Sequence, residues 1–225
     1  MKLLAIEAAT EACSAAVLVD DEVIEQYQLA PRKHNEILLP MCEQVLAEME
    51  LSISQLDIIA FGCGPGAFTG VRIAAGVAQG IAFAHDLPAA SVSTLANLAC
   101  QSEVEPDSLV IPAIDARMSE VYWAGYRKIS ECEAELELPE KVEAPESIRV
   151  EHTAIACGLG SGWSAYPEIM QANFSVEPLH IDPKALPRAR TTALIGQQKA
   201  LSSQLINAEK ILPVYLRDNV AHKKI

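Results

Sequence analysis

Apolar residues gather in five short runs within the first hundred residues of the chain. Three of these runs open the sequence, at residues 2–7, 13–20 and 23–29, and two more follow at 56–61 and 88–92. Runs of this length, bounded by turn-forming residues, are typical of β-strands. The first half of the chain is therefore expected to contain five strands.

A helical spacing of apolar residues separates the third strand from the fourth. The stripe consists of Ile37, Leu38, Met41, Val45, Leu46 and Met49, which fall on one face of an α-helix. Pro40 has to sit in the first turns of this helix or kink it. Two more helices are predicted at about residues 69–85 and 93–101, each directly after a strand. Strands that alternate with helices indicate an α/β fold.

Two short sequences return in the second half of the chain, in the same order. "AIEA" at 5–8 returns as "AIDA" at 113–116, and "IAFGCGPG" at 59–66 returns as "IACGLGSG" at 155–162. Each copy follows or ends an apolar run, which favours an internal duplication. The alternative is that acids and glycines simply collect at strand ends in any α/β fold.

A duplicated unit of this kind suits the two-lobed actin-like (ribonuclease-H-like, ASKHA) architecture, in which a cleft between the lobes holds a nucleotide. The predicted lobes are residues 1–106, with the glycine-rich turn, and 107–225, which is smaller. The boundary is placed near the polar, proline-containing segment 102–108. The C-terminal tail is expected to pack back on the first lobe.

The segment "GCGPGAFTGVRIAAG" at 62–76 joins the fourth strand to a helix. It is not a Walker loop, because no lysine lies between Lys33 and Lys128, and it matches the dinucleotide fingerprint only loosely. Its glycines permit close backbone approach, and a helix N-terminus favours an anion. Thr69 is the predicted N-cap, and Arg72 could pair with phosphate or carboxylate. The predicted nucleotide-binding residues are Gly64, Gly66, Thr69, Gly70 and Arg72; a tight turn without a ligand is the alternative.

The helix after this turn carries few bulky side chains. Its small residues allow another helix to approach closely, and Ala74, Ala75, Ala78 and Ala82 are the predicted partner interface. The approaching helix could belong to a subunit or, as the alternative, to the same chain.

Charge and composition limit the partners. The formal net charge is −13, whereas a protein that binds nucleic acid alone needs a basic surface. The longest apolar runs fall short of the roughly 18 residues of a membrane span, so no membrane contact is expected. The six cysteines show no close pairing, which is typical of reduced thiols in a cytoplasmic protein.

The sequence lacks the residue spacings that are typical of metal sites and of catalytic nucleophiles. The five histidines are at least 28 residues apart, and the sequence has no Cys-x-x-Cys and no Gly-x-Ser-x-Gly elbow. We therefore expect no metal site and no self-sufficient catalytic centre.

The glycine segment, extended to "GCGPGAFTGVRIAAGVAQGIA" at 62–82, resembles the signature of the tRNA threonylcarbamoyladenosine family. "MKLLAIEAATEACSAAV", "HNEILLP", "IDARMSEVYWAGY" and "PVYLRDNVAHKK" are similar to its TsaB (YeaZ) branch along nearly the whole chain. Residues 64–73 fall on the signature in order. Glu7 stands where the family usually has Asp, and Ala74 stands where the signature has its final Gly.

The resemblance implies an actin-like fold and a non-catalytic scaffold and activator subunit of the bacterial system that forms N6-threonylcarbamoyladenosine beside the anticodon of ANN-decoding tRNAs. It implies pairing with a catalytic paralogue (TsaD), docking of an ATPase subunit (TsaE), and a homodimer when the chain is alone. It implies tRNA contact only through the complex, no cofactor for this chain, and ATP at a subunit interface. The rival hypothesis is an ATP-dependent phosphotransferase of the actin-like fold, with Glu7 or Asp115 as its acid.

Overall fold

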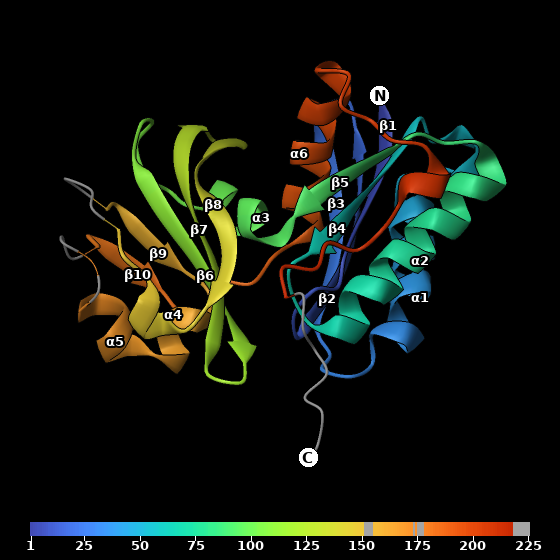
Figure 1. Ribbon diagram of the computed structural model, residues 1–225. Helices are drawn as coiled ribbons and strands as arrows, with labels where there is room; N and C mark the ends of the chain where they lie inside the picture. Colours follow the sequence, from blue (N-terminus) through green and yellow to red (C-terminus); the bar gives the residue numbers. More distant parts are fainter. Residues whose placement is uncertain (151–154, 173, 175–177, 218–225) are drawn as a thin grey trace, which may run out of the picture.

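The computed structural model describes residues 1–150, 155–172, 174 and 178–217. The end of the "PVYLRDNVAHKK" motif, from position 218 onward, lies outside the described residues. Two five-stranded sheets stand side by side with helices on their faces (Figure 1).

The first sheet has the strand order β3-β2-β1-β4-β5. Its strands are β1 (Lys2–Glu7), β2 (Ala12–Val19), β3 (Glu22–Leu29), β4 (Ile58–Gly64) and β5 (Ala89–Ser93). All five predicted strands are present. β4 ends three residues later than predicted because its pairing with β5 continues into the glycine turn, where Gly62 lies opposite Val92 and Gly64 opposite Ser93.

The second sheet repeats this arrangement. Its strands are β6 (Leu109–Arg117), β7 (Glu120–Ser130), β8 (Glu133–Glu143), β9 (Cys157–Leu159) and β10 (His180–Asp182). Read from β8, the order is β8-β7-β6-β9-β10, with two antiparallel pairs followed by two parallel pairs, as in the first sheet. The duplicated two-lobed α/β fold is thereby confirmed.

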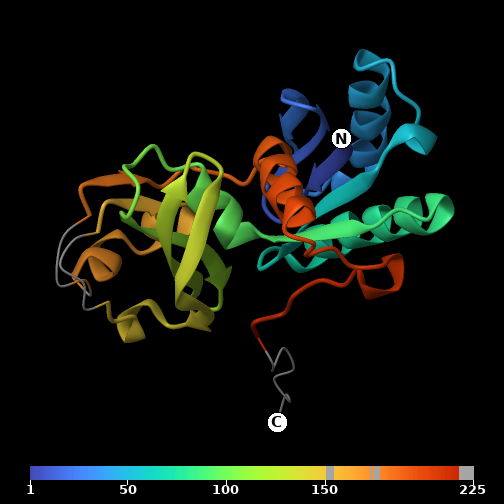
Figure 2. The ribbon, with the colours of Figure 1, turned by 90° about the horizontal axis from the view of Figure 1, so that it is seen from above.

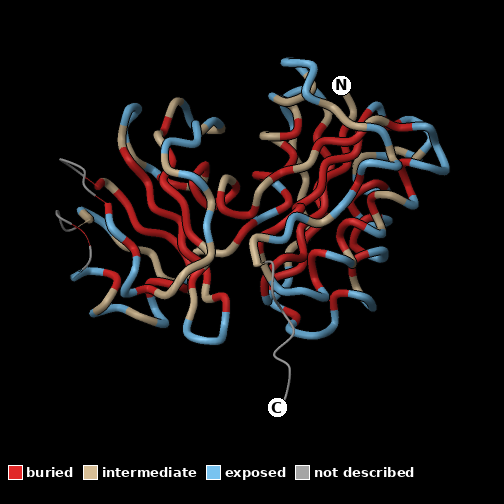
Figure 3. The backbone as a smooth tube through the Cα atoms, in the orientation of Figure 1, coloured by how far each residue is buried: buried red, intermediate tan, exposed pale blue. Residues whose placement is uncertain are grey.

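Helices cover both faces of the first sheet. α1 (His34–Glu48) and α2 (Phe68–His85) pack on one face, and α6 (Ala189–Leu201) packs on the other. The predicted apolar stripe of α1 is buried or half-buried against the sheet, and the helix carries Pro40 in its second turn. Figure 3 shows buried strands inside and exposed helix surfaces outside.

The second sheet is covered by α4 (Ser161–Ala165) and α5 (Pro167–Ala172) on one side and by α3 (Thr94–Cys100) on the other. Short 3₁₀ turns are η1 (Ile53–Gln55), η2 (Pro145–Ser147) and η3 (Ala208–Lys210). None of the helices in the described ranges is long and apolar enough to cross a membrane.

The two lobes exchange helices at the point where they meet. α3 follows β5 of the first sheet but packs on the second, through Leu95, Leu98 and Ala99. α6 follows β10 of the second sheet but packs on the first, through Ala189 and Ala193. Figure 2 shows both connections running between the lobes. The chain thus returns to the first lobe with α6, well before the tail that the sequence suggested, because α6 supplies the apolar cover that this face of the sheet needs.

Candidate functional site

A cleft of about 1080 Å³ lies between the lobes. The first lobe lines it with the β1–β2 turn, the start of α1 and the start of α2, and the second lobe lines it with the β6–β7 turn and α4. The C-terminal tail contributes Val214, Tyr215 and Arg217. A cleft between duplicated lobes is where an actin-like fold is expected to hold a ligand.

Two glycines of the turn at 62–76 pack directly against the backbone of the β1–β2 turn, so the space beside them is filled. A Cβ at Gly70 would lie 2.0 Å from the carbonyl oxygen of Ala8, and one at Gly66 would lie 2.3 Å from that of Ala9. The amide of Ala67 donates to the same Ala9 oxygen at 2.7 Å. These glycines are needed because two backbone segments pass closer than any side chain permits.

Gly62 and Gly64 meet two other parts of the chain. A Cβ at Gly62 would lie 2.1 Å from Oε2 of Glu7. Gly64 has φ +101° and faces the carbonyl oxygen of Val214 in the tail. Packing within the chain therefore accounts for four of the five glycines in the turn, which sequence spacing alone cannot distinguish from phosphate binding.

The structure brings together only part of the predicted nucleotide site. Gly66, Thr69 and Gly70 line the cleft, whereas Gly64 and Arg72 do not. The N-cap of α2 is Ala67, two residues before the predicted Thr69, because the helix already begins at Phe68. The first bond of the helix runs from the Val71 amide to the Ala67 oxygen. The amides of residues 68–70 precede it, and a helix start of this kind attracts anions.

Arg72 does not line the cleft, but its side chain lies against two aromatic residues that do, Phe68 and Tyr215. Its Cζ lies 3.2 Å from the ring centroid of Phe68 and 5.0 Å from that of Tyr215. Its predicted pairing with phosphate or carboxylate stays a prediction; in the structure Arg72 stands in the second turn of α2, which begins at Phe68. Its guanidinium instead makes a cation–π contact.

The second glycine turn repeats the packing role of the first. Gly160 has φ +98°, and its Cβ would lie 2.5 Å from the Ala113 oxygen, while Gly162 would meet the Ala113 side chain at 2.9 Å. Ala113 stands in the "AIDA" sequence, the counterpart of "AIEA" in the first lobe. In both lobes the glycine turn thus packs against the strand that carries the first echo, through Gly62 and Glu7 in the first lobe and through Gly160 and Ala113 in the second.

The two acids of the phosphotransferase hypothesis are placed differently. Glu7 is buried and does not line the cleft; its Oε1 accepts from the amides of Ala8 and Ala9, and burial raises the pKa of its carboxyl to about 7. Asp115 lines the cleft, but both of its carboxylate oxygens accept from Arg117, at 2.9 Å each. Across the described ranges no three His, Cys, Asp or Glu side chains gather as metal ligands.

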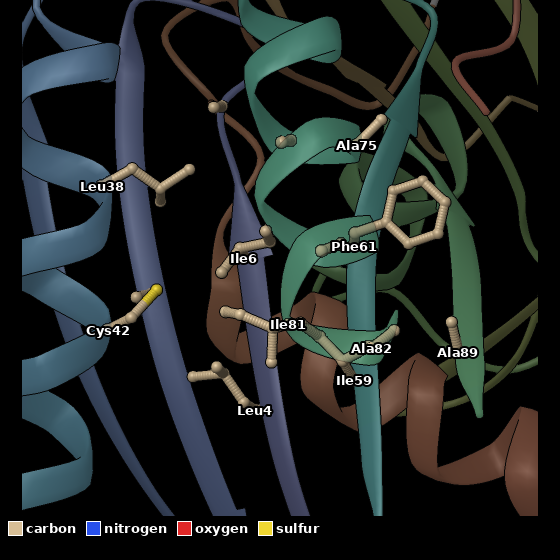
Figure 4. Close-up of a cluster of buried hydrophobic side chains, with 14 of the residues drawn as sticks. Leu4, Ile6, Leu38, Cys42, Ile59, Phe61, Ala75, Ile81, Ala82 and Ala89 are labelled. Atoms are coloured by element: carbon tan, nitrogen blue, oxygen red, sulfur yellow. The ribbon is translucent and has the colours of Figure 1, made fainter. Parts of the chain in front are cut away.

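The predicted partner interface is wrong as to its residues. Ala74, Ala75, Ala78 and Ala82 are 0–4% exposed and pack against the first sheet, and Figure 4 shows Ala75 and Ala82 in this cluster with Phe61 and Ile59. The small side chains let α2 lie close to the sheet of its own chain, which was the alternative that the sequence left open.

The tail makes contacts that the sequence did not predict in detail. The Val214 amide donates to the Cys63 oxygen at 2.8 Å. Arg217 donates to the Ala116 oxygen at 3.1 Å and forms an ion pair with Glu120 in the second lobe. The tail thus links the glycine turn to the β6–β7 turn across the cleft; the motif "PVYLR" was the only signal for it.

All six cysteines are free thiols, and five of them are buried. Burial raises the pKa of the Cys13, Cys42 and Cys63 thiols to about 12. The prediction of reduced, structural cysteines is consistent with these surroundings.

Comparison with known proteins matches this chain along its whole length. The sequence model of the family described as "TsaD: tRNA N6-adenosine threonylcarbamoyltransferase" matches residues 17–225. The "tRNA threonylcarbamoyladenosine biosynthesis protein TsaB" of Escherichia coli K12 is 38% identical over 229 residues, covering 100% of this chain and 98% of that protein. The protein of the same name from Haemophilus influenzae is also 38% identical, covering 100% and 97%.

A solved structure agrees with these relatives. "YeaZ from Pseudomonas aeruginosa" superposes with a TM-score of 0.87 at 41% sequence identity, covering 96% of this chain and 99% of that chain. The similarity therefore includes both lobes and their mutual arrangement.

Proposed function

Because the chain belongs to the TsaB branch of the tRNA threonylcarbamoyladenosine family, we propose that it is a non-catalytic subunit that pairs with a TsaD-like catalytic paralogue. The chain is an accessory subunit of tRNA threonylcarbamoyladenosine biosynthesis. A largely exposed face of α2, which Tyr215 of the tail contacts at its N-terminal end, supports the pairing. This pairing face consists of Phe68, Arg72, Gly76, Gly80 and Phe83.

Two glycines of the pairing face are the observation that carries the proposal. A Cβ built on Gly76 or on Gly80 meets no atom of the described residues within 4 Å. Each glycine in a helix interior costs about 1 kcal/mol relative to alanine, and nothing in the described part of the chain requires either of them. A helix from another chain that crosses at this point with close backbone contact accounts for both.

Large side chains surround these glycines. Phe68 is 58% exposed and Phe83 is 75% exposed, while Ile73 and Val77 are half-buried beside them. Aromatic residues and arginine carry much of the binding energy in protein interfaces. The surface over the two glycines is low and lies between the side chains of Phe68 and Phe83. It therefore has the shape to accept an apolar helix of a partner.

A paralogue that resembles this chain would present a similar helix, so the same face serves two pairings. Alone, the chain forms a homodimer through α2; with the paralogue, the heterodimer replaces it. Both are two-fold or pseudo-two-fold arrangements of one surface, and they compete.

Gly76→Leu and Gly80→Leu test the pairing face. Both side chains point into open space, so each variant keeps or gains stability as a single chain, whereas pairing weakens at least about tenfold because the partner helix is held away. Sedimentation velocity and co-purification with the paralogue measure pairing, and circular dichroism follows the fold. Ala172→Leu, an exposed position on α5, adds the same bulk elsewhere. Unchanged homodimer and heterodimer in both glycine variants would place the interface on another surface.

The absence of catalysis in the isolated chain is the second part of the proposal. Glu7 is buried and does not line the cleft, and Asp115 is bonded to Arg117, which leaves the phosphotransferase hypothesis without a free acid. Pure protein is expected to give no threonylcarbamoyl transfer from its adenylate to tRNA. Turnover by the pure chain that disappears in Asp115→Asn would contradict this.

The complex also explains the charge. A chain with a net charge of −13 gains little from counterion release, so tRNA is bound by the other subunits, in the cytoplasm. A TsaE-like ATPase completes the assembly, with ATP at a subunit interface and no cofactor of this chain's own. A filter-binding titration at physiological salt tests this: a sub-micromolar tRNA affinity of the chain alone would refute it.

A further inference from the structure

A carboxyl group is buried where the two lobes join. Glu7 ends β1, and none of its surface is exposed. Its Oε1 accepts hydrogen bonds from the amides of Ala8 and Ala9, at 2.9 Å each. Its Oε2 has no hydrogen-bond partner among the described residues. Burying a charged carboxylate oxygen without a hydrogen-bond donor costs free energy, which favours the protonated form of this group.

The space around Oε2 is shaped for the carboxyl. Gly62 lies beside it on β4, and a Cβ there would come within 2.1 Å of Oε2. Ser14 is its neighbour on β2, and its Oγ accepts from the amide of Ala189 at the start of α6. The Thr192 hydroxyl of α6 faces the carboxyl, and a hydrogen bond donated from it lowers the pKa of Glu7, by less than burial raises it. Glu7 is thus enclosed between the first sheet and the helix that returns from the second lobe.

The Thr192 hydroxyl has one place left for a hydrogen bond. It donates its hydrogen to the Arg188 oxygen at 3.2 Å and accepts from Nδ2 of Asn97 at 2.9 Å. A hydroxyl has one hydrogen and two lone pairs. The remaining lone pair can only accept, and a carboxyl group offers a donor only while it carries its proton.

The same residues join α3 to α6. Nδ2 of Asn97 also donates to the Arg188 oxygen at 2.9 Å, and the Arg188 amide donates to Oδ1 of Asn97 at 3.1 Å. Gln101 donates to Asn97 and to the Leu186 oxygen. These bonds connect the two helices that the lobes exchange, and we call this set the joint.

We propose that Glu7 stands in the folded protein as the neutral acid, with its proton directed at Thr192, and that its ionisation loosens the joint between the lobes. The ionised carboxylate needs a donor at Oε2, and the Thr192 hydroxyl, which faces the carboxyl, can supply one. When Thr192 turns to supply it, the Arg188 oxygen loses one of its three donors and keeps those from Nδ2 of Asn97 and the Thr192 amide. Burial supports this state, because it raises the pKa of the Glu7 carboxyl to about 7.

No charged side chain of the described residues lies against Glu7 to stabilise the anion. The titratable groups that sense its charge are the thiols of Cys13 on β2 and Cys63 on β4. Arg188, at the start of α6, is turned to Glu25. α3 brings Thr94 and Asn97, which do not titrate.

The sign of the pH effect follows from the two pKa values. The carboxyl has a pKa of 4.5 when unfolded and about 7 when folded, so the folded state holds more protons between these values. Stability therefore falls as the pH rises from about 4.5 to about 7 and changes no further above it. The folding equilibrium constant changes by up to roughly 300-fold over this window through this one group.

The first experiment observes the carboxyl in the wild-type chain. The Cδ resonance of Glu7 is assigned through its own backbone and followed by NMR from about pH 4 to about pH 9. A midpoint near neutrality is expected, with a parallel change in the resonances of Thr192 and Asn97. A midpoint below about 5 would overturn the proposal, because an ordinary carboxylate would then fill this site at neutral pH.

The second experiment removes the proton dependence. Glu7→Gln keeps an acceptor for the Ala8 and Ala9 amides and a permanent donor for Thr192. Relative to wild type, its stability should no longer fall through neutral pH, and the first turn of α6 should keep its hydrogen-exchange protection above pH 7. Glu22→Gln, at an exposed position of the same sheet, should follow the wild type. Equal loss of protection in wild type and Glu7→Gln would show that the joint does not respond to Glu7.

Discussion

Arg72 lies against the ring of Phe68, with Cζ 3.2 Å from the ring centroid, one turn apart on the outer side of α2. Tyr215 of the tail completes the contact, its ring centroid 6.3 Å from that of Phe68. A preorganised pair of an aromatic ring and a guanidinium on an exposed surface loses little conformational entropy when a partner covers it. The N-terminal end of the proposed pairing face is therefore expected to lose little conformational entropy when a partner binds.

We predict that Phe68→Ala and Arg72→Ala each weaken pairing with the paralogue by about 1–4 kcal/mol. Stability of the single chain should change by no more than about 0.5 kcal/mol, because both side chains are exposed. Titration calorimetry measures the first quantity and chemical denaturation the second. Leu201→Ala, an exposed apolar side chain on α6, should leave pairing unchanged; equal losses in all three variants would indicate a nonspecific effect.

Two glycines of α2 should respond oppositely to alanine. Gly70→Ala places a Cβ 2.0 Å from the Ala8 oxygen and is expected to destabilise the chain by about 2 kcal/mol or more, since two backbone segments must separate. Gly76→Ala meets no described atom and should stabilise the single chain by about 0.5–1 kcal/mol. Urea unfolding at a concentration where the chain is monomeric compares them. A loss of stability in Gly76→Ala would mean that its face is covered within the chain.

Lys128 caps the C-terminus of α3 from the second lobe. It is 3% exposed, and its Nζ donates to the carbonyl oxygens of Cys100, Ser102 and Glu131 at 2.7, 2.9 and 3.2 Å. Lys128→Met leaves these oxygens without their donor and should cost about 2 kcal/mol or more. Lys141→Met, at an exposed position on β8, should cost less than about 0.5 kcal/mol. Similar unfolding midpoints for the two variants would contradict the capping role.

Arg217 fastens the tail across the cleft. Arg217→Ala removes the ion pair with Glu120 and the bond to the Ala116 oxygen, so the amide of Val214, bonded to Cys63, should exchange at least about tenfold faster by local opening. Hydrogen exchange measured by mass spectrometry on peptides of residues 211–217 tests this. Arg127→Ala, which breaks only ion pairs on the surface of the second sheet, should leave the tail protected.

The sequence determined the elements and their duplication. Strands, α1 and α2 could be placed from apolar spacing because the side chains that face a sheet recur with the period of the element itself. The echoes of "AIEA" and "IAFGCGPG" revealed the repeat because the same close contact, glycine turn against strand end, is made in each lobe. Acidity and the missing ligand spacings were also properties of the chain alone.

Only the tertiary structure decided which small residues of α2 serve which neighbour. Both faces of the helix carry small side chains. Ala74, Ala75, Ala78 and Ala82 pack against the sheet, whereas a Cβ at Gly76 or Gly80 would meet no neighbouring segment among residues 1–150, 155–172, 174 and 178–217. The periodicity of the sequence shows on which face of its helix a side chain lies, but not which segment packs against that face. For the same reason, the sequence could not predict that Glu7 is neutral or that α3 and α6 pack on the opposite lobe. The burial of Glu7 and its hydrogen-bond partners depend on α6, which lies more than a hundred positions away in the sequence.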